Sequence, residues 1–74
     1  LHLLDLLNVV PFDSRAAYEY GKIFAHLQKS GTPIGTTDML IAALARLHSL
    51  TIVTNNVREF SRVPNLKVEN WCEY

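Results

Sequence analysis

Four side chains in the second half of this 74-residue chain carry oxygens that could hold a divalent cation: Asp38, Asn55, Asn56 and Glu59. Carboxylate and amide oxygens are the ligands that Mg²⁺ and Mn²⁺ prefer. Each position also has an ordinary structural explanation. An acid in the first turn of a helix is stabilised by the helix dipole, and asparagines favour turns. Taken together, the residues favour a metal site over either explanation alone.

The number of carboxylates limits the chemistry that these residues can perform. Metal-dependent hydrolysis of a phosphodiester commonly uses two cations about 4 Å apart. Several carboxylates must neutralise that charge while leaving positions open for phosphate and water. Asp38 and Glu59 with one amide are too few, so we expect further ligands outside this sequence.

Two other groups of side chains give weaker indications. Arg58 and Arg62 lie one helical turn apart beside the acidic cluster, where they could either hold a phosphate or simply face solvent. The three histidines, His2, His26 and His48, have no spacing that gathers them on one face. A zinc site is therefore not expected.

Hydrophobic periodicity predicts three elements in the first part of the chain. Leucines three apart indicate the end of an amphipathic helix over residues 1–7, and a short strand is expected at residues 9–10. Asp13 and Ser14 are both good N-caps for a helix over residues 14–29. A glycine just beyond that helix and a proline soon after it predict its end.

A more apolar region follows. Thr36 or Thr37 can cap a helix whose residues 39–47 are apolar nearly all round, which predicts burial on more than one side. Residues 50–54 are a β-branched run without alternation, as in a parallel strand that is covered on both faces. A turn of helix and a small strand ending near Trp71 complete the order. We predict an α/β fold of three layers, with ligands beyond the carboxyl ends of the strands.

Composition excludes several classes of protein. Hydrophobic residues make up 49% and charged residues 19%, as in a globular domain, and no apolar run approaches the roughly 20 residues of a membrane span. Seven basic residues balance seven acidic ones, so net charge gives no argument for nucleic-acid binding. Cys72 is the single cysteine and forms no internal disulfide, which suits a reducing compartment. The cytoplasm is the expected location.

Two segments resemble a known family of nucleases. Pro33–Ala43 followed by Val53–Pro64 looks like the PIN-domain ribonucleases, and most of all like the VapC toxins of bacterial toxin–antitoxin modules. Val10–Asp13, Tyr20–Ile23 and Val68–Trp71 also fit the pattern. The joint occurrence of these segments in this order is far more specific than any one of them.

The resemblance implies an endoribonuclease that hydrolyses RNA phosphodiester bonds with Mg²⁺ or Mn²⁺. It also implies a VapB-type antitoxin as inhibitor and, for the complete protein, a homodimer. By motif, the catalytic residues are Asp38, Asn56 and Glu59, and the metal ligands among them are Asp38 and Glu59. Thr54 matches the threonine that commonly ends the strand.

The sequence departs from the family pattern at its beginning. PIN domains begin with a strand that carries an aspartate, followed by a helix that supplies a glutamate. Neither is recognisable here, so residues 1–74 are interpreted as the carboxyl-terminal part of a single PIN domain, lacking the first strand and the helices after it. We expect weak metal binding and little or no cleavage by this chain alone. The alternative is a non-catalytic remnant that binds an antitoxin or a PIN partner through exposed apolar surface.

Overall fold

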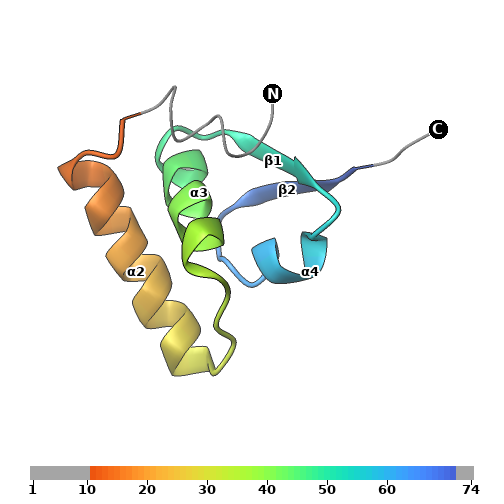
Figure 1. Ribbon diagram of the computed structural model, residues 1–74, viewed down its shortest axis with the longest axis horizontal. Helices are drawn as coiled ribbons and strands as arrows, with labels where there is room; N and C mark the ends of the chain where they lie inside the picture. Colours follow the sequence, from red (N-terminus) through yellow and green to blue (C-terminus); the bar gives the residue numbers. More distant parts are fainter. Residues whose placement is uncertain (1–10, 72–74) are drawn as a thin grey trace.

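The computed structural model describes residues 11–71, which form three helices and two strands (Figure 1). The elements are α2 (Ser14–Ser30), α3 (Thr36–Leu47), β1 (Thr51–Thr54), α4 (Val57–Phe60) and β2 (Lys67–Asn70). The helix predicted at residues 1–7 and the strand predicted at residues 9–10 lie outside the described residues. No helix of the described part is long and apolar enough to cross a membrane.

Helix α2 confirms the helix that was predicted over residues 14–29, with one residue more at its end. Asp13 is the N-cap, and its Oδ1 accepts hydrogen bonds of 3.1 Å from the backbone N–H groups of Arg15 and Ala16. The helix ends at Gly31, whose φ of 70° lies in the left-handed region that glycine adopts without strain. Both ends of α2 are therefore set by local chemistry.

Helix α3 is the buried helix that its apolar composition predicts, but its predicted cap is wrong. The N-cap is Gly35, and no side chain caps the helix. Thr36 and Thr37 lie inside the first turn and are exposed. The extended backbone at Gly35 already places that residue at the cap, because its carbonyl oxygen accepts the amide of Met39 at 3.0 Å. The buried residues of α3 are Met39, Ile41, Ala42, Ala43, Leu44 and Ala45.

A partly buried arginine fastens α3 to its neighbours at the end far from Asp38. Glu19 Oε2 accepts hydrogen bonds from Arg46 Nη2 at 2.6 Å and from Arg46 Nε at 3.2 Å. Arg46 Nη1 donates to the carbonyl oxygen of Pro64 at 3.1 Å. The hydrogen bond from Arg46 lowers the pKa of Glu19. One guanidinium therefore connects α2, α3 and the loop between α4 and β2.

Strands β1 and β2 pair in parallel, in a register that places Ile52 beside Val68, with α4 in the crossover between them. The predicted α/β class, a parallel sheet with flanking helices, is confirmed. The prediction that residues 50–54 are covered on both faces is wrong for the described part of the chain. Ile52 and Thr54 are buried, while Val53 between them is 44% exposed. The strand alternates because, within residues 11–71, the apolar core lies on one of its faces.

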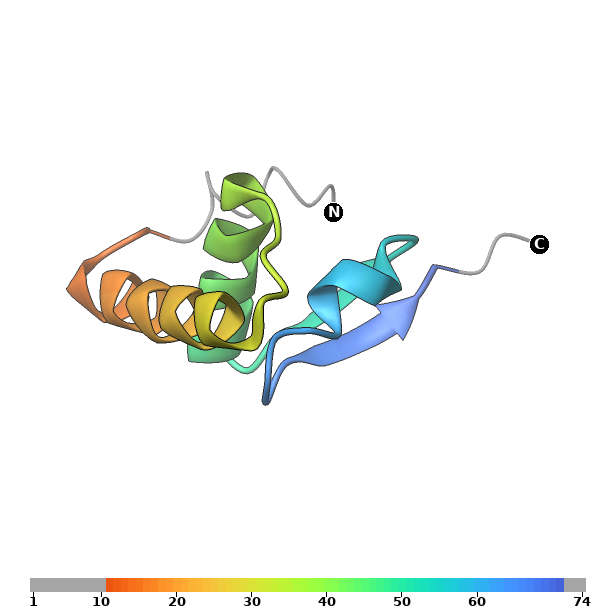
Figure 2. The ribbon, with the colours of Figure 1, turned by 90° about the horizontal axis from the view of Figure 1, so that it is seen from below.

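A single apolar core joins the helices to the sheet. Figure 2 shows the arrangement of the elements around it, with α2 and α3 side by side and α4 beside the two strands. Its largest fully buried side chains come from three different helices: Phe60, Ile23, Leu27, Ile41 and Leu44. Ile52 and Val63 extend the core to β1 and to the loop after α4. The position of α4 relative to the first turn of α3 is therefore set by shared packing, and that is where the candidate site lies.

Candidate metal site at the start of helix α3

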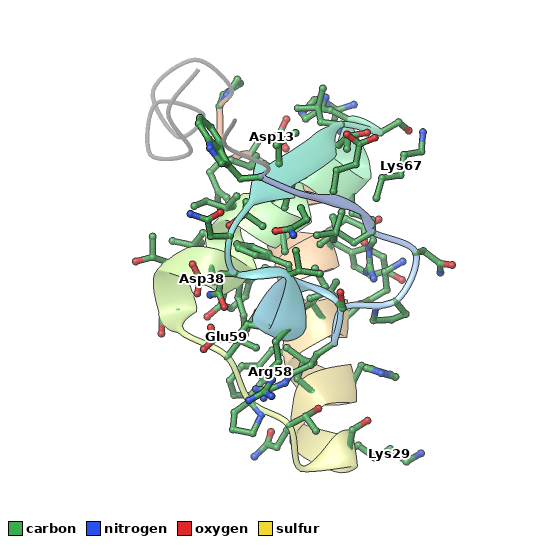
Figure 3. All side chains as sticks on the ribbon, turned by 90° about the vertical axis from the view of Figure 1, so that its right-hand side faces the viewer. Asp13, Lys29, Asp38, Arg58, Glu59 and Lys67 are labelled. Atoms are coloured by element: carbon green, nitrogen blue, oxygen red, sulfur yellow. The ribbon has the colours of Figure 1, made fainter. Side chains whose placement is uncertain are left out.

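Asp38 and Glu59 come together where the first turn of α3 meets α4, whereas Asp13 and Lys67 lie apart from them (Figure 3). Partial burial raises the pKa of Asp38, and a hydrogen bond and the negative charge of Glu59 raise it further. Such an effect of one carboxyl group on another requires the two to be near neighbours. The two predicted metal ligands therefore lie side by side.

Asn56 links this acidic pair to the end of strand β1. Its side-chain Nδ2 donates to Glu59 Oε2 at 3.1 Å, and its backbone N–H donates to Thr54 Oγ1 at 3.0 Å. Thr54 itself is buried. The structure thus gathers the four residues that match the family motif, while Asn55 is exposed and makes no hydrogen bond to either carboxylate within residues 11–71.

The two arginines beside the acidic pair differ in their surroundings. Arg62 Nη1 donates to the carbonyl oxygen of Pro33 at 3.0 Å, a role that neither interpretation of the sequence included. Arg58 is exposed and lies beside Glu59, and within the described residues it makes no ion pair. For Arg58 both interpretations, phosphate contact and solvated side chain, stay open. The partners in the Arg62 contact are 29 residues apart, so no local pattern indicates it.

The donor set fits one hard divalent cation in part. Two carboxylates balance the charge of one Mg²⁺ or Mn²⁺, and their oxygens are ligands of the preferred type. Residues 11–71 contain no group of three or more His, Cys, Asp or Glu side chains that could hold a metal ion. Asp38 and Glu59 would therefore need water or further ligands to complete the coordination.

The raised pKa of Asp38 predicts an effect on stability that depends on pH. Between the ordinary pKa and the raised one, the folded chain binds more protons than the unfolded chain, so its free energy of unfolding falls as pH rises. Asp38→Asn removes this loss. Without metal, we expect the variant to be more stable than the natural chain at pH 7, by up to about 1 kcal/mol for a pair that is only partly buried.

Urea unfolding of both proteins in EDTA, at pH 3 and at pH 7, measures this difference. It should be small at pH 3, where Asp38 is protonated in both states, and larger at pH 7. A difference that is independent of pH would contradict the raised pKa of Asp38.

An α/β fold with paired carboxyl groups beyond the end of a parallel strand is the arrangement expected of a PIN-domain nuclease. The PIN domain family matches residues 1–66, and the chain belongs to that family. The chain is 46% identical over 69 residues to the tRNA(fMet)-specific endonuclease VapC of Salmonella typhimurium, covering 93% of this chain and 52% of that protein. It is 41% identical over 68 residues to ribonuclease VapC2 of Rickettsia felis, covering 92% and 51%.

Solved structures of related proteins are also similar to this chain. VapBC2 from Rickettsia felis, bound to a DNA fragment from its promoter, is similar with a TM-score of 0.77 and 43% identity, over 82% of this chain and 46% of that one. FitAB bound to a DNA fragment is similar with a TM-score of 0.77 and 31% identity, over 96% and 52%. The chain spans about half the length of the curated relatives that it matches.

Proposed function

We propose that this chain supplies part of the active site of a VapC-type endoribonuclease, the toxin of a toxin–antitoxin module. Asp38 and Glu59 hold Mg²⁺ or Mn²⁺ in this proposal, and Asn56 completes the catalytic group. The nearness of Asp38 and Glu59 is the observation that carries it, because separate segments bring together two carboxyl groups that repel each other when both are ionised. The names of the relatives, endonuclease and ribonuclease, support the reaction.

In this proposal, each residue of the site has a separate role. A bound cation supplies polarisation of the phosphate and a water of lowered pKa. Asp38 and Glu59 provide charged oxygens, and a neighbouring positive charge favours the ionised form of Asp38. Asn56 holds the Glu59 carboxylate through its Nδ2, and Thr54 holds the backbone of Asn56. The hydrogen bonds therefore orient one ligand before any metal arrives.

The proposed partners are an RNA substrate and a VapB-type antitoxin, and the complete protein is proposed to be a homodimer. VapB–VapC complexes among the similar structures support the antitoxin. Net charge is zero, so attraction of RNA must come from local groups, and the exposed Arg58 beside Glu59 is one candidate. With two carboxylates available, we propose that these 74 residues alone bind metal weakly and cleave little or no RNA.

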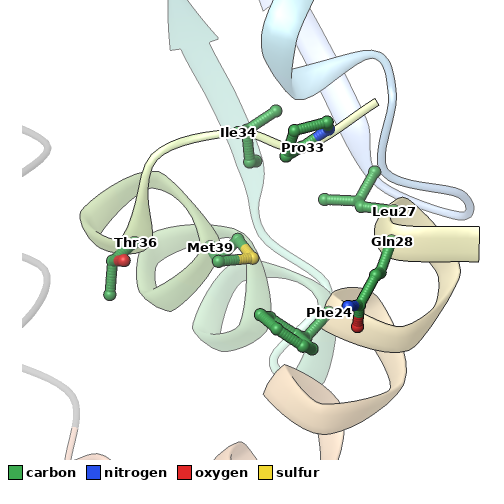
Figure 4. Close-up of a pocket in the computed structure, with 7 residues that line it drawn as sticks. All are labelled: Phe24, Leu27, Gln28, Pro33, Ile34, Thr36 and Met39. Carbon is green, nitrogen blue, oxygen red and sulfur yellow. The ribbon is translucent and has the colours of Figure 1, made fainter. Parts of the chain in front are cut away.

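A second candidate function is binding without catalysis, as a remnant that holds an antitoxin or a PIN partner. A mainly apolar hollow of about 440 Å³ between α2 and α3 favours it (Figure 4). Phe24 and Met39 line this hollow, together with Pro33 and Ile34, and Phe24 is 46% exposed. Exposed apolar surface of this kind is typical of interaction sites.

A graft separates the two functions. Residues 11–71 replace the matching segment of the Salmonella typhimurium VapC, and the folded chimera is assayed on tRNA(fMet) in Mn²⁺. The proposed ribonuclease function predicts metal-dependent cleavage that falls to background with Asp38→Asn in the graft, whereas the 74-residue chain alone remains inactive. A chimera that folds and binds the VapB of that relative, yet leaves RNA intact, would support binding without catalysis.

A further inference from the structure

Arg62 is bonded to both segments that carry the acidic pair. Its Nη1 donates to the carbonyl oxygen of Pro33 at 3.0 Å, in the loop that leads into α3. Its backbone N–H donates to the carbonyl oxygen of Glu59 at 3.1 Å, at the end of α4. One residue therefore ties the approach to Asp38 directly to the turn of helix that carries Glu59.

Little else directs the approach of these two segments. Apart from the contact of the carboxyl groups themselves, the Arg62–Pro33 bond is the one hydrogen bond in residues 11–71 that joins the Pro33–Gly35 loop to α4 and its end. Ile34 and Phe60 share the apolar core, but apolar packing is not directional. Two ionised carboxylates also repel each other. A directional bond at this point opposes their separation.

We infer that Arg62 is a positioning residue, which holds the Pro33–Gly35 loop against α4 and so fixes the separation of Asp38 and Glu59. Its guanidinium acts through the carbonyl oxygen of Pro33 and does not touch the acidic pair. The consequence for metal binding rests on the proposed function. The consequence for geometry does not rest on the proposed function, and it can be measured without metal.

Two kinds of variant separate positioning from general stability. Arg62→Met keeps an apolar stem and removes the donor, and Arg62→Gln serves as a second variant because its amide is too short to reach Pro33. Arg62→Lys keeps a donor of nearly the same reach. Arg46→Met is the matched control, since it also removes an arginine that donates to a proline carbonyl oxygen, at the opposite end of α3.

Three measurements are made on each variant of the 74-residue chain. These are proton–proton NOEs between the Pro33–Gly35 loop and α4 in EDTA, Mn²⁺ affinity by calorimetry, and the thermal midpoint. We expect Arg62→Met and Arg62→Gln to lose the NOEs and about tenfold in Mn²⁺ affinity, the low end for residues that orient metal ligands. Arg62→Lys should retain both. Arg46→Met should lower the thermal midpoint at least as far, yet keep the NOEs and the affinity.

The outcomes distinguish this inference from the proposed function. Intact NOEs in both Arg62→Met and Arg62→Gln, or an equal loss of affinity in Arg46→Met, would overturn the positioning role. A natural chain that binds no Mn²⁺ while its Arg62→Met variant loses the NOEs would overturn the metal site and leave the positioning role supported.

Discussion

Asp38→Asn and Glu59→Gln should each weaken Mn²⁺ binding by at least about tenfold. Loss of a residue that merely orients a metal ligand typically costs 10–100-fold, so loss of a ligand's charge should cost no less. Either amide keeps the shape of the side chain but removes one of the two negative charges that face the cation. Because the carboxyl groups lie side by side, neither can serve alone as well as the pair. Calorimetric titration with Mn²⁺ measures the change.

Glu69 provides a control for the change in net charge. Glu69 is exposed on β2, so Glu69→Gln removes the same net charge without touching the pair. It should cost far less affinity than Asp38→Asn at moderate salt, because salt screens an exposed charge that does not bind the cation. Equal losses in Glu69→Gln and Asp38→Asn would mean that Mn²⁺ responds to net charge and has no defined site.

Phe60→Ala should remove a large part of the free energy of unfolding. Phe60 is 1% exposed and joins α4 to the core, and deleting a buried phenyl ring typically costs 3–5 kcal/mol. Domains are stabilised by roughly 0.05–0.15 kcal/mol per residue, which gives a chain of this length on the order of 4–11 kcal/mol. The loss is therefore between about a third of the free energy of unfolding and all of it. Urea unfolding followed by circular dichroism measures it.

Phe24→Ala is the matched control for that loss. The same ring is removed, but Phe24 is 46% exposed, so much less apolar surface leaves the core. We expect a cost well below that of Phe60→Ala. Similar costs for the two variants would show that α4 is not held by the core as described, and the positions of Glu59 and Asn56 would lose their explanation.

The parts of the fold that local chemistry determines were predictable. Asp13 caps α2 and Gly31 ends it, as their types and positions indicate. Which faces of the strand at residues 50–54 are covered was not predictable. A β-branched run indicates that a strand forms, but it does not indicate which elements lie against its two faces. The predicted cap of α3 was also wrong. Thr36 and Thr37 are both suited to capping, but the helix already begins after Gly35, so both threonines lie inside it.

The candidate site was also predictable only in part. Its residue types were predictable, because Asp38, Asn56 and Glu59 fall within segments that match a family motif. The hydrogen bonds from Arg62 to Pro33 and from Arg46 to Glu19 were not, because their partners lie 29 and 27 residues apart and depend on how the helices pack. Local periodicity and propensity carry no information about such contacts. The Arg62–Pro33 bond is the one that we infer to hold the site in place, whereas the Arg46–Glu19 bond fastens the opposite end of α3.

The acidic pair itself is unfavourable without a cation. Partial burial and the neighbouring Glu59 both oppose ionisation of Asp38, as the raised pKa records. Local conflicts of this kind concentrate at functional sites, where a ligand relieves them. The stability lost at neutral pH comes from the partial burial of Asp38 and from the nearness of Glu59, and we propose that the same nearness provides the metal affinity.

Paramagnetic broadening by Mn²⁺ tests most directly whether that pair is a metal site. Amide spectra of the 74-residue chain are recorded with substoichiometric Mn²⁺ and again after EDTA. We predict that the amides of Asp38, Asn56 and Glu59 broaden first and recover with EDTA, while those around Glu19, which is bonded to the opposite end of α3, broaden last. Broadening centred on Glu19 or Glu69, or no selective broadening at any Mn²⁺ concentration, would contradict the site.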